Sequence, residues 1–130
     1  ESLKKQTRTQ IDGVCITVTD SITFLNESNS GDIVVCGSHG GLSAGNYAKK
    51  YRVKAVFFND AGIGKNNAGA KSLEFLNDVG IPACTVDCMS AEIFNGQDVL
   101  DNGIISVCNP LAKNRNIKKK LTVKEAIKYI

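Results

Sequence analysis

The sequence predicts a single α/β domain built on a mainly parallel β-sheet with helices on both faces. Three observations favour this fold class. Apolar runs end at residues 36, 58 and 108 and are continuous rather than alternating, as in strands that are buried on both faces. Segments in which apolar residues recur at helical spacing separate the runs. Glycine-rich turns follow two of them, which is typical of a Rossmann-like or flavodoxin-like three-layer sandwich.

Length and composition agree with one globular domain. The chain has 130 residues, of which 42% are hydrophobic and 22% are charged. We expect residues 1–12 to be a polar N-terminal lead-in and residues 13–130 to form the α/β domain. No apolar run approaches the roughly 20 residues of a membrane span. The first ten residues lack the apolar segment of a signal peptide, so no membrane partner is predicted.

Cysteine usage and charge distribution bear on location and partners. The cysteines number five, and four of them lie in or beside apolar runs, which predicts reduced thiols in a cytoplasmic protein. Residues 113–130 hold seven Lys or Arg against one acid, Glu125, while the rest of the chain has nine positive and twelve negative residues. We interpret this segment as the solvated face of a basic C-terminal helix. The absence of a known nucleic-acid motif argues against a nucleic-acid partner.

The first half of the chain supplies two predicted strands and a helix. Residues 13–19 alternate apolar and polar side chains, which predicts a strand, and a polar loop precedes the central strand at 33–36. The central strand ends in the turn Gly-Ser-His-Gly-Gly, which contains the only histidine, His39. Four apolar side chains then share a helix face, with Ser43 as the expected N-cap.

The second half repeats this pattern. The apolar strand at 55–58 leads through a second glycine-rich turn into a helix whose buried face carries Leu73 and Leu76. Further strands are predicted at 83–88 and 104–108. A capping box from Thr122 to Glu125 opens the terminal helix.

Polar side chains follow the strands at their carboxyl ends. Parallel strands end at the same edge of a sheet, where open α/β sheets bind ligands. We therefore expect one crevice that collects the following residues: Ser38, His39, Asn59, Asp60, Ser90, Glu92 and also Asn109.

The turn after the central strand has three interpretations. Gly41 to Gly45 matches the esterase motif G-x-S-x-G, but Ser43 lies too far beyond the strand and the histidine precedes it. The spacing also departs from the dinucleotide fingerprint. An anion-binding turn, using backbone N–H groups and the following helix dipole, is the interpretation we favour, beside a purely structural turn.

The candidate catalytic residues are His39 and Asp60. His39 has the titration range for proton transfer, and Asp60 would orient it or serve as a second base. A structural histidine and an Asp60 that accepts only backbone N–H bonds are the alternatives. The candidate ligand-binding residues are Gly37, Ser38, Gly40, Gly41, Asn59, Gly62, Gly64, Lys65, Ser90 and Glu92.

No metal or other cofactor is predicted. Cys36 and His39 could join Cys84 and Cys88 in a zinc site, but the last two would lie ~13 Å apart on an extended strand. Cys88 as a nucleophile at a strand end stays open. The loop with Lys65 lacks the spacing of a Walker A motif.

The leading functional hypothesis is an enzyme that performs acid–base chemistry of the hydrolase, lyase or isomerase type on a small anionic, carbonyl-containing metabolite. The alternative is a non-catalytic module that binds or sequesters a nucleotide-like ligand in the same crevice. The third hypothesis is a homo-oligomer or partner-binding domain whose interface fills the crevice. The fold itself does not decide among them.

Overall fold

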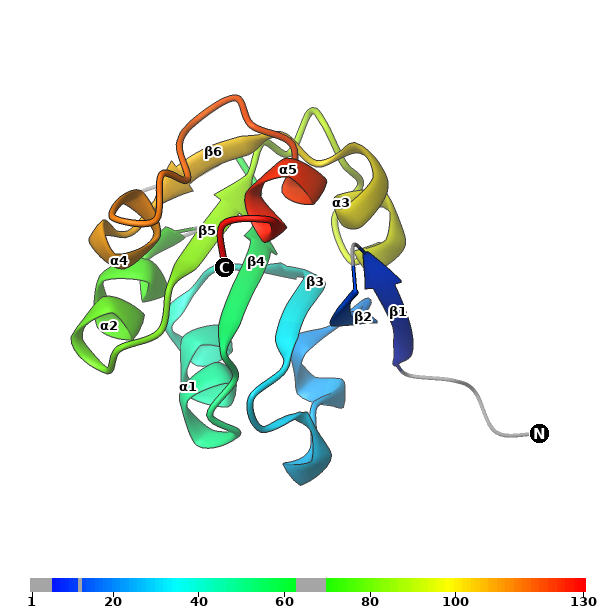
Figure 1. The fold of residues 1–130 in the computed structure, drawn as a ribbon, viewed down its shortest axis with the longest axis vertical. Coiled ribbons are helices and arrows are strands. Elements are labelled where there is room, and N and C mark those ends of the chain that lie inside the picture. Colours follow the sequence, from blue (N-terminus) through cyan, green and yellow to red (C-terminus); the bar gives the residue numbers. More distant parts are fainter. Residues whose placement is uncertain (1–5, 12, 63–69) are drawn as a thin grey trace.

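The computed structural model describes residues 6–11, 13–62 and 70–130, which include a six-stranded sheet (Figure 1). The strands are β1 (Thr7–Ile11), β2 (Val14–Thr19), β3 (Ile33–His39), β4 (Ala55–Asn59), β5 (Ala83–Val86) and β6 (Ile105–Cys108). Their spatial order follows the chain order. The four strands β2 to β5 are parallel, and β1 and β6 are antiparallel edge strands. The prediction of an α/β fold on a mainly parallel sheet is confirmed.

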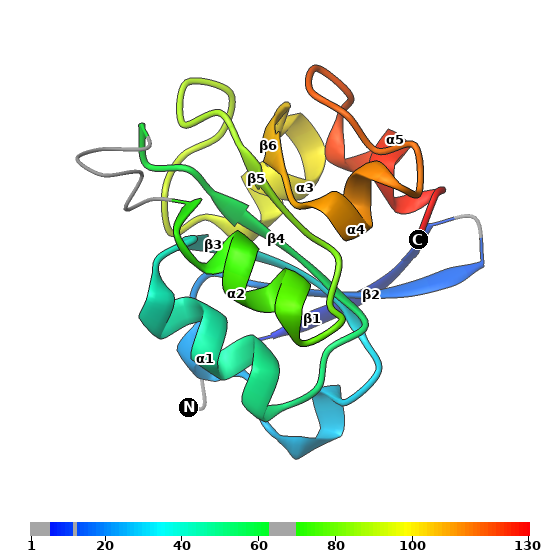
Figure 2. The same ribbon diagram turned by 90° about the vertical axis from the view of Figure 1, so that its left-hand side faces the viewer.

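Short helices connect the strands. They are α1 (Leu42–Lys50), α2 (Ser72–Asp78), α3 (Gly96–Asn102), α4 (Pro110–Lys113) and α5 (Val123–Ile127), with 3-10 helices η1 (Ile22–Phe24) and η2 (Glu27–Asn29) before β3. Figure 2 shows α1 and α2 side by side in front of the sheet, with α3 and α5 farther back. None of the described helices is long and apolar enough to cross a membrane.

The strands contribute alternate residues to two apolar clusters. Val34 and Phe58 belong to a cluster that also contains Leu73 and Leu76 of α2. Val35, beside Val34 in the chain, belongs to the other cluster, which includes side chains of α3 and α5. Because both sets of strand side chains are buried, the strands are continuous apolar runs.

The sequential strand order differs from that of a doubly wound sheet. In Rossmann-like and flavodoxin-like folds the order reverses at a switch point, where the ligand crevice opens. The strands of the described residues run from β1 to β6 without a reversal. A crevice at a switch point therefore has no counterpart in this part of the chain.

Several local predictions differ from the structure. The central strand, predicted over 33–36, extends to His39, so the segment 37–39 belongs to β3 and not to the turn. Residues 7–11, expected in the polar lead-in, form β1 with Thr7 opposite Val18; this strand is at the edge and largely exposed, so it has no apolar pattern. The N-cap of α1 is Gly41, so Ser43 lies within the first turn. β6 runs antiparallel to β5, which places Asn109 at the opposite edge from the other predicted site residues.

Candidate functional site

The carboxyl edge of the parallel strands brings several of the predicted residues together. His39 is paired with Asn59 in the register of β3 and β4, and Asp60 follows directly. Ser90 and Glu92 lie in the loop after β5. Gly64 and Lys65 are outside the described residues. Among the described residues, His39 and Asp60 share neither a hydrogen bond nor an ion pair.

A small cavity of about 160 Å³ lies beside His39. We call it the His39 cavity, and its lining residues come from η1, β3, α1 and the loop after β5: Ser21, Ile22, Thr23, Ser38, His39, Ser43, Ala44, Tyr47 and Phe94. The lining has five hydroxyl-bearing residues and the aromatic residue Phe94 beside His39, which is exposed. Sequence reasoning missed the residues of η1 and α1, because they are not at a strand end.

Ser38 and Gly37 hold in place the segments that line this cavity. Ser38 is buried, and its Oγ accepts the N–H of Ile22 at 2.9 Å, which fixes η1 against β3. Phe94 N–H donates to the Gly37 carbonyl at 2.7 Å. A Cβ at Gly37 would lie 2.3 Å from the backbone nitrogen of Asn95, so only glycine allows this loop to approach β3. Both residues therefore have structural contacts that place other residues at the cavity.

The hydrogen bond of His39 determines which ring nitrogen can act on a ligand. Its Nδ1 accepts the backbone N–H of Gly41 at 3.0 Å. In the neutral imidazole, the proton inferred from this bond is therefore on Nε2. The other ring nitrogen, Nε2, is therefore a hydrogen-bond donor. Accepting a proton at Nε2 would require the other tautomer, whose Nδ1–H would oppose the Gly41 N–H.

The two glycines after His39 join the turn to the helices. The Gly40 carbonyl accepts both the backbone N–H and the hydroxyl of Ser72, at 2.9 and 2.7 Å. Gly41 is the N-cap of α1. Because glycine has no side chain, no side-chain hydrogen bond caps the first turn of this helix. The first turn also supplies Ser43 and Ala44 to the cavity wall.

Asn59 and Asp60 are engaged by their own loops. Asp60 is 4% exposed, and its Oδ1 accepts the N–H groups of Gly62 at 2.7 Å and Cys88 at 3.0 Å. Asn59 is fully buried and bonds to Ala61 N–H and the Ala91 carbonyl. These contacts correspond to the structural alternative for Asp60.

The residues after β5 have similar roles. Ser90 Oγ donates to the Asp87 carbonyl at 2.6 Å and accepts the N–H of Ile104 at 3.0 Å. The exposed Glu92 accepts a hydrogen bond from the Asn95 amide at 3.2 Å. Both are held within the loop, and neither lines the His39 cavity.

One group near this edge has the donor atoms for a metal ion. Asp60, Asp87 and Cys88 each offer one atom, and these atoms all lie within 4.8 Å of one another. Desolvation, and then the negative charges of Asp60 and Asp87, raise the pKa of the Cys88 thiol. A raised pKa keeps the thiol protonated at neutral pH, which disfavours Cys88 as a nucleophile. Sequence reasoning missed Asp87, because the predicted strand 83–88 contained it. β5 ends at Val86, so Asp87 directly follows the strand.

Asp98 in α3 anchors the same loop. The N–H of Glu92 donates to its carboxylate at 2.8 Å, and the Asn102 amide donates at 2.7 Å. These two hydrogen bonds, the first being the larger cause, lower the pKa of Asp98.

We predict that Asp98 makes folding stability pH-dependent. Because its pKa is lowered in the folded state, its contribution is present above the unfolded value near 3.9 and is lost as pH falls through the folded pKa. Asp98→Asn should therefore melt below wild type at neutral pH, and the difference should vanish in acid. Thermal melts across this range test it, with Asp78→Asn as an exposed control. A difference that persists unchanged in acid would contradict the prediction.

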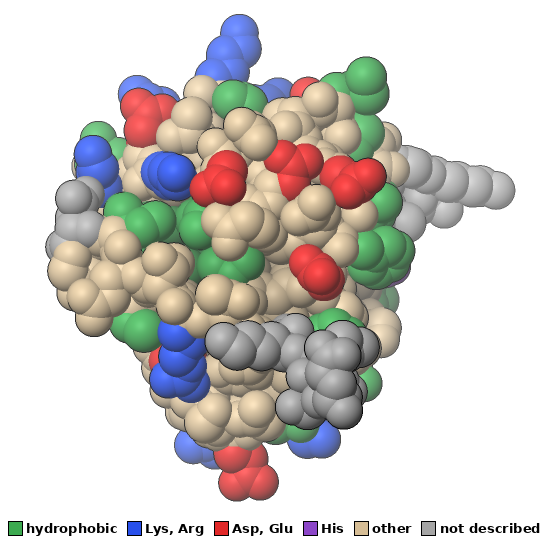
Figure 3. Space-filling model, turned by 90° about the vertical axis from the view of Figure 1, so that its right-hand side faces the viewer, with side chains coloured by type: hydrophobic (Ala, Val, Ile, Leu, Met, Phe, Trp, Pro, Cys, Tyr) green, Lys and Arg blue, Asp and Glu red, His purple; other side chains and the backbone are tan. Residues whose placement is uncertain are grey.

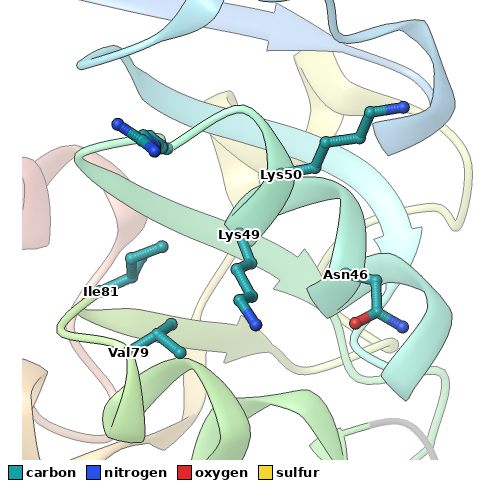
Figure 4. Close-up of a pocket in the computed structure, with 6 residues that line it drawn as sticks. Asn46, Lys49, Lys50, Val79 and Ile81 are labelled. Atoms are coloured by element: carbon teal, nitrogen blue, oxygen red, sulfur yellow. The ribbon is translucent and has the colours of Figure 1, made fainter.

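A larger cavity on the described residues is a different kind of surface. It has a volume of about 670 Å³ and is lined by Asn46, Lys49, Lys50, Arg52, Val79 and Ile81 (Figure 4). Its cations do not converge, since Lys49 and Lys50 point in different directions. Lys49 Nζ lies 5.4 Å from the Phe75 ring centroid and Lys50 Nζ lies 5.2 Å from that of Tyr51. We therefore place the candidate site at the His39 cavity.

The face shown in Figure 3 carries several acidic side chains in its upper half.

A separate cavity of about 290 Å³ lies between the end of β2 and the start of α3 and has Asp20 in its wall. The Asp20 carboxylate accepts the Gly96 N–H at 2.9 Å. This cavity offers no cation to an anionic ligand among its lining residues.

Comparison with known proteins found no matching family model, no similar curated protein and no similar solved structure.

Proposed function

We propose that this domain binds a small metabolite with a carbonyl or carboxylate oxygen in the His39 cavity. The observation that carries the proposal is the hydrogen bond from Gly41 N–H to His39 Nδ1, because it presents Nε2–H as a fixed donor. A ligand oxygen is the complementary acceptor.

The size and lining of the cavity support a small ligand. Its volume of about 160 Å³ is below the ~300 Å³ at which pockets for drug-sized ligands begin. This favours a metabolite of few atoms over the nucleotide-like ligand of the alternative hypothesis. Hydroxyls of Ser43 and Tyr47 supply further polar partners, and the 57% exposed Phe94 supplies an apolar face.

An enzyme acting on the same ligand is the second candidate. Tyr47 lines the cavity together with His39, so two groups able to donate or accept a proton border one space. In this version the Nε2–H of His39 polarises the ligand oxygen as a hydrogen-bond donor, and Tyr47 transfers the proton. Asp60 is not the partner of His39, because the Oδ1 atom of Asp60 holds the loop. Hydrolase, lyase and isomerase chemistry remain the reaction classes of this proposal.

The wider setting is proposed on related grounds. Two apolar clusters with different helices support a three-layer sandwich. Five free cysteines support a cytoplasmic location, where thiols remain reduced. A homo-oligomer that covers the cavity is the third candidate, supported by the 51% exposed Leu42 at the start of α1.

Two substitutions of His39 separate its two nitrogens. His39→Asn keeps an acceptor near Nδ1 for the Gly41 N–H but lacks a donor at the Nε2 position, whereas His39→Gln keeps the donor and loses the acceptor. We expect His39→Asn to weaken ligand binding about tenfold or more, because it removes one hydrogen bond to a charged group of the ligand. His39→Gln should retain more of the affinity.

Thermal-shift titration with small carboxylates and 2-oxo acids, followed by calorimetry, measures these affinities. Lys49→Ala, in the cavity of about 670 Å³, is the control. Equal binding by wild type and His39→Asn would overturn the proposal. Tyr47→Phe tests the enzyme version, because it should remove turnover of a bound ligand while it weakens binding less than His39→Asn does.

A further inference from the structure

Two cysteines face each other across the antiparallel strands β5 and β6. Cys84 and Cys108 are direct partners in the register. Both belong to the same apolar cluster, so their side chains lie on the same face of the sheet. They are 1% and 6% exposed, respectively.

Cys84 and Cys108 form a pair whose backbone groups are not hydrogen-bonded to each other. Asn109 N–H donates to the Ala83 carbonyl at 3.0 Å, which makes the adjacent pair the hydrogen-bonded one. On the other side of β5, the carbonyls of Pro82 and Val86 accept bonds from β4 and the residue after it. Along a strand, the N–H and C=O groups of successive residues point alternately to the two neighbouring strands. Those of Cys84 therefore also point toward β4 and not toward β6.

This pairing suits a disulfide. Partners in a non-hydrogen-bonded antiparallel pair have Cα atoms ~4.5 Å apart and the closer side chains. Disulfides form at Cα separations of about 4.4–6.8 Å. The two thiols can therefore be linked with little movement of the strands.

Cys108 lines two cavities. One has a volume of about 660 Å³ and also has Glu74 and Asp78 in its lining. The other is basic. This cavity has a volume of about 480 Å³ and is lined by Cys108, Lys113, Asn116, Ile117, Lys118 and Lys119. We call it the lysine cavity. Five of its six lining residues belong to the basic segment 113–130, which the sequence led us to interpret as the solvated face of a terminal helix. A hydrogen bond with Cys84 lowers the pKa of Cys108; burial opposes this shift, and the positive charge of Lys113 adds to it. The same hydrogen bond and burial raise the pKa of Cys84.

We propose that Cys84 and Cys108 are a redox-active dithiol that is oxidised by an anionic low-molecular-weight disulfide bound in the lysine cavity. The Cys108 thiolate attacks one sulfur of the reagent, whose S–S bond breaks and releases one thiolate. Cys84 then loses its proton to solvent and attacks the Cys108 sulfur, which releases the second thiolate. The protein dithiol loses two electrons to the reagent, and the products are one protein disulfide and two small thiols.

The test treats the full chain with oxidised glutathione, which is anionic, and with cystamine, which is cationic. Peptide mapping by mass spectrometry under non-reducing conditions should identify a Cys84–Cys108 link. The link should form about tenfold faster with oxidised glutathione, because the lysines concentrate an anion. Neutralising Lys113, Lys118 and Lys119 to glutamine should remove this preference, and Lys49→Gln with Lys50→Gln should not.

Single variants identify the attacking thiol. Cys84→Ser should trap glutathione on Cys108, whereas Cys108→Ser should leave Cys84 unmodified. If these variants fail to fold, the wild-type peptide map and the charge preference still decide the question. No Cys84–Cys108 link in wild type, or equal rates with the two reagents, would overturn the proposal.

Discussion

Replacement of Asn109 by alanine is expected to destabilise the domain more than any other change considered. The side chain is 2% exposed and bonds to four backbone groups. Its amide donates to the carbonyls of Leu73 and Ile81, and its oxygen accepts the N–H groups of Ala83 and Ala112, at 3.0–3.1 Å. Unpaired buried groups cost roughly 1–3 kcal/mol each, so we expect a loss of about 4 kcal/mol or more. That is a large part of a domain's usual stability.

Urea unfolding followed by circular dichroism measures this loss. Asn109→Asp keeps the two acceptor contacts but buries a carboxylate oxygen against the carbonyls of Leu73 and Ile81, so it should be at least as destabilised as Asn109→Ala at neutral pH. Asn114→Ala removes an exposed asparagine in the same segment and should change stability within about 0.5 kcal/mol. An Asn109→Ala protein as stable as the Asn114→Ala control would show that these hydrogen bonds contribute little.

Truncation of Leu76 is the second large effect. Leu76 is fully buried in the cluster with Phe58 and Val56, and removal of its side chain leaves a cavity that the sheet cannot close. Leu76→Ala should lower the free energy of unfolding by about 2–5 kcal/mol, and Leu73→Ala should behave similarly. Chemical denaturation gives both values.

Leu42→Ala is the matched control for this change. It removes the same atoms from a side chain that is 51% exposed, so it should have a much smaller effect. If Leu42→Ala and Leu76→Ala cost the same, the helix face assigned to the core would be wrong.

The sequence alone determined the elements whose signals are local. Continuous apolar runs predicted β3 and β4, since both faces of these strands are covered. Helical spacing placed Leu73 and Leu76 in the core, and both are buried. The capping box is present, with Thr122 and Glu125 exchanging hydrogen bonds at the start of α5. In each case the sequence signal is a pattern of residues that are close in the chain.

Tertiary structure decided the features that depend on distant contacts. β1 exists because it pairs with β2. The direction of β6 places Asn109 at the other edge, where three of its four partners are 26 to 36 residues away in the chain. His39 could be identified as a candidate from its turn, but its companions in the cavity come from η1, α1 and the Phe94 loop. A residue pattern records which faces are apolar. It does not record which strands become neighbours, because hydrogen bonds between strands use backbone groups that every residue has.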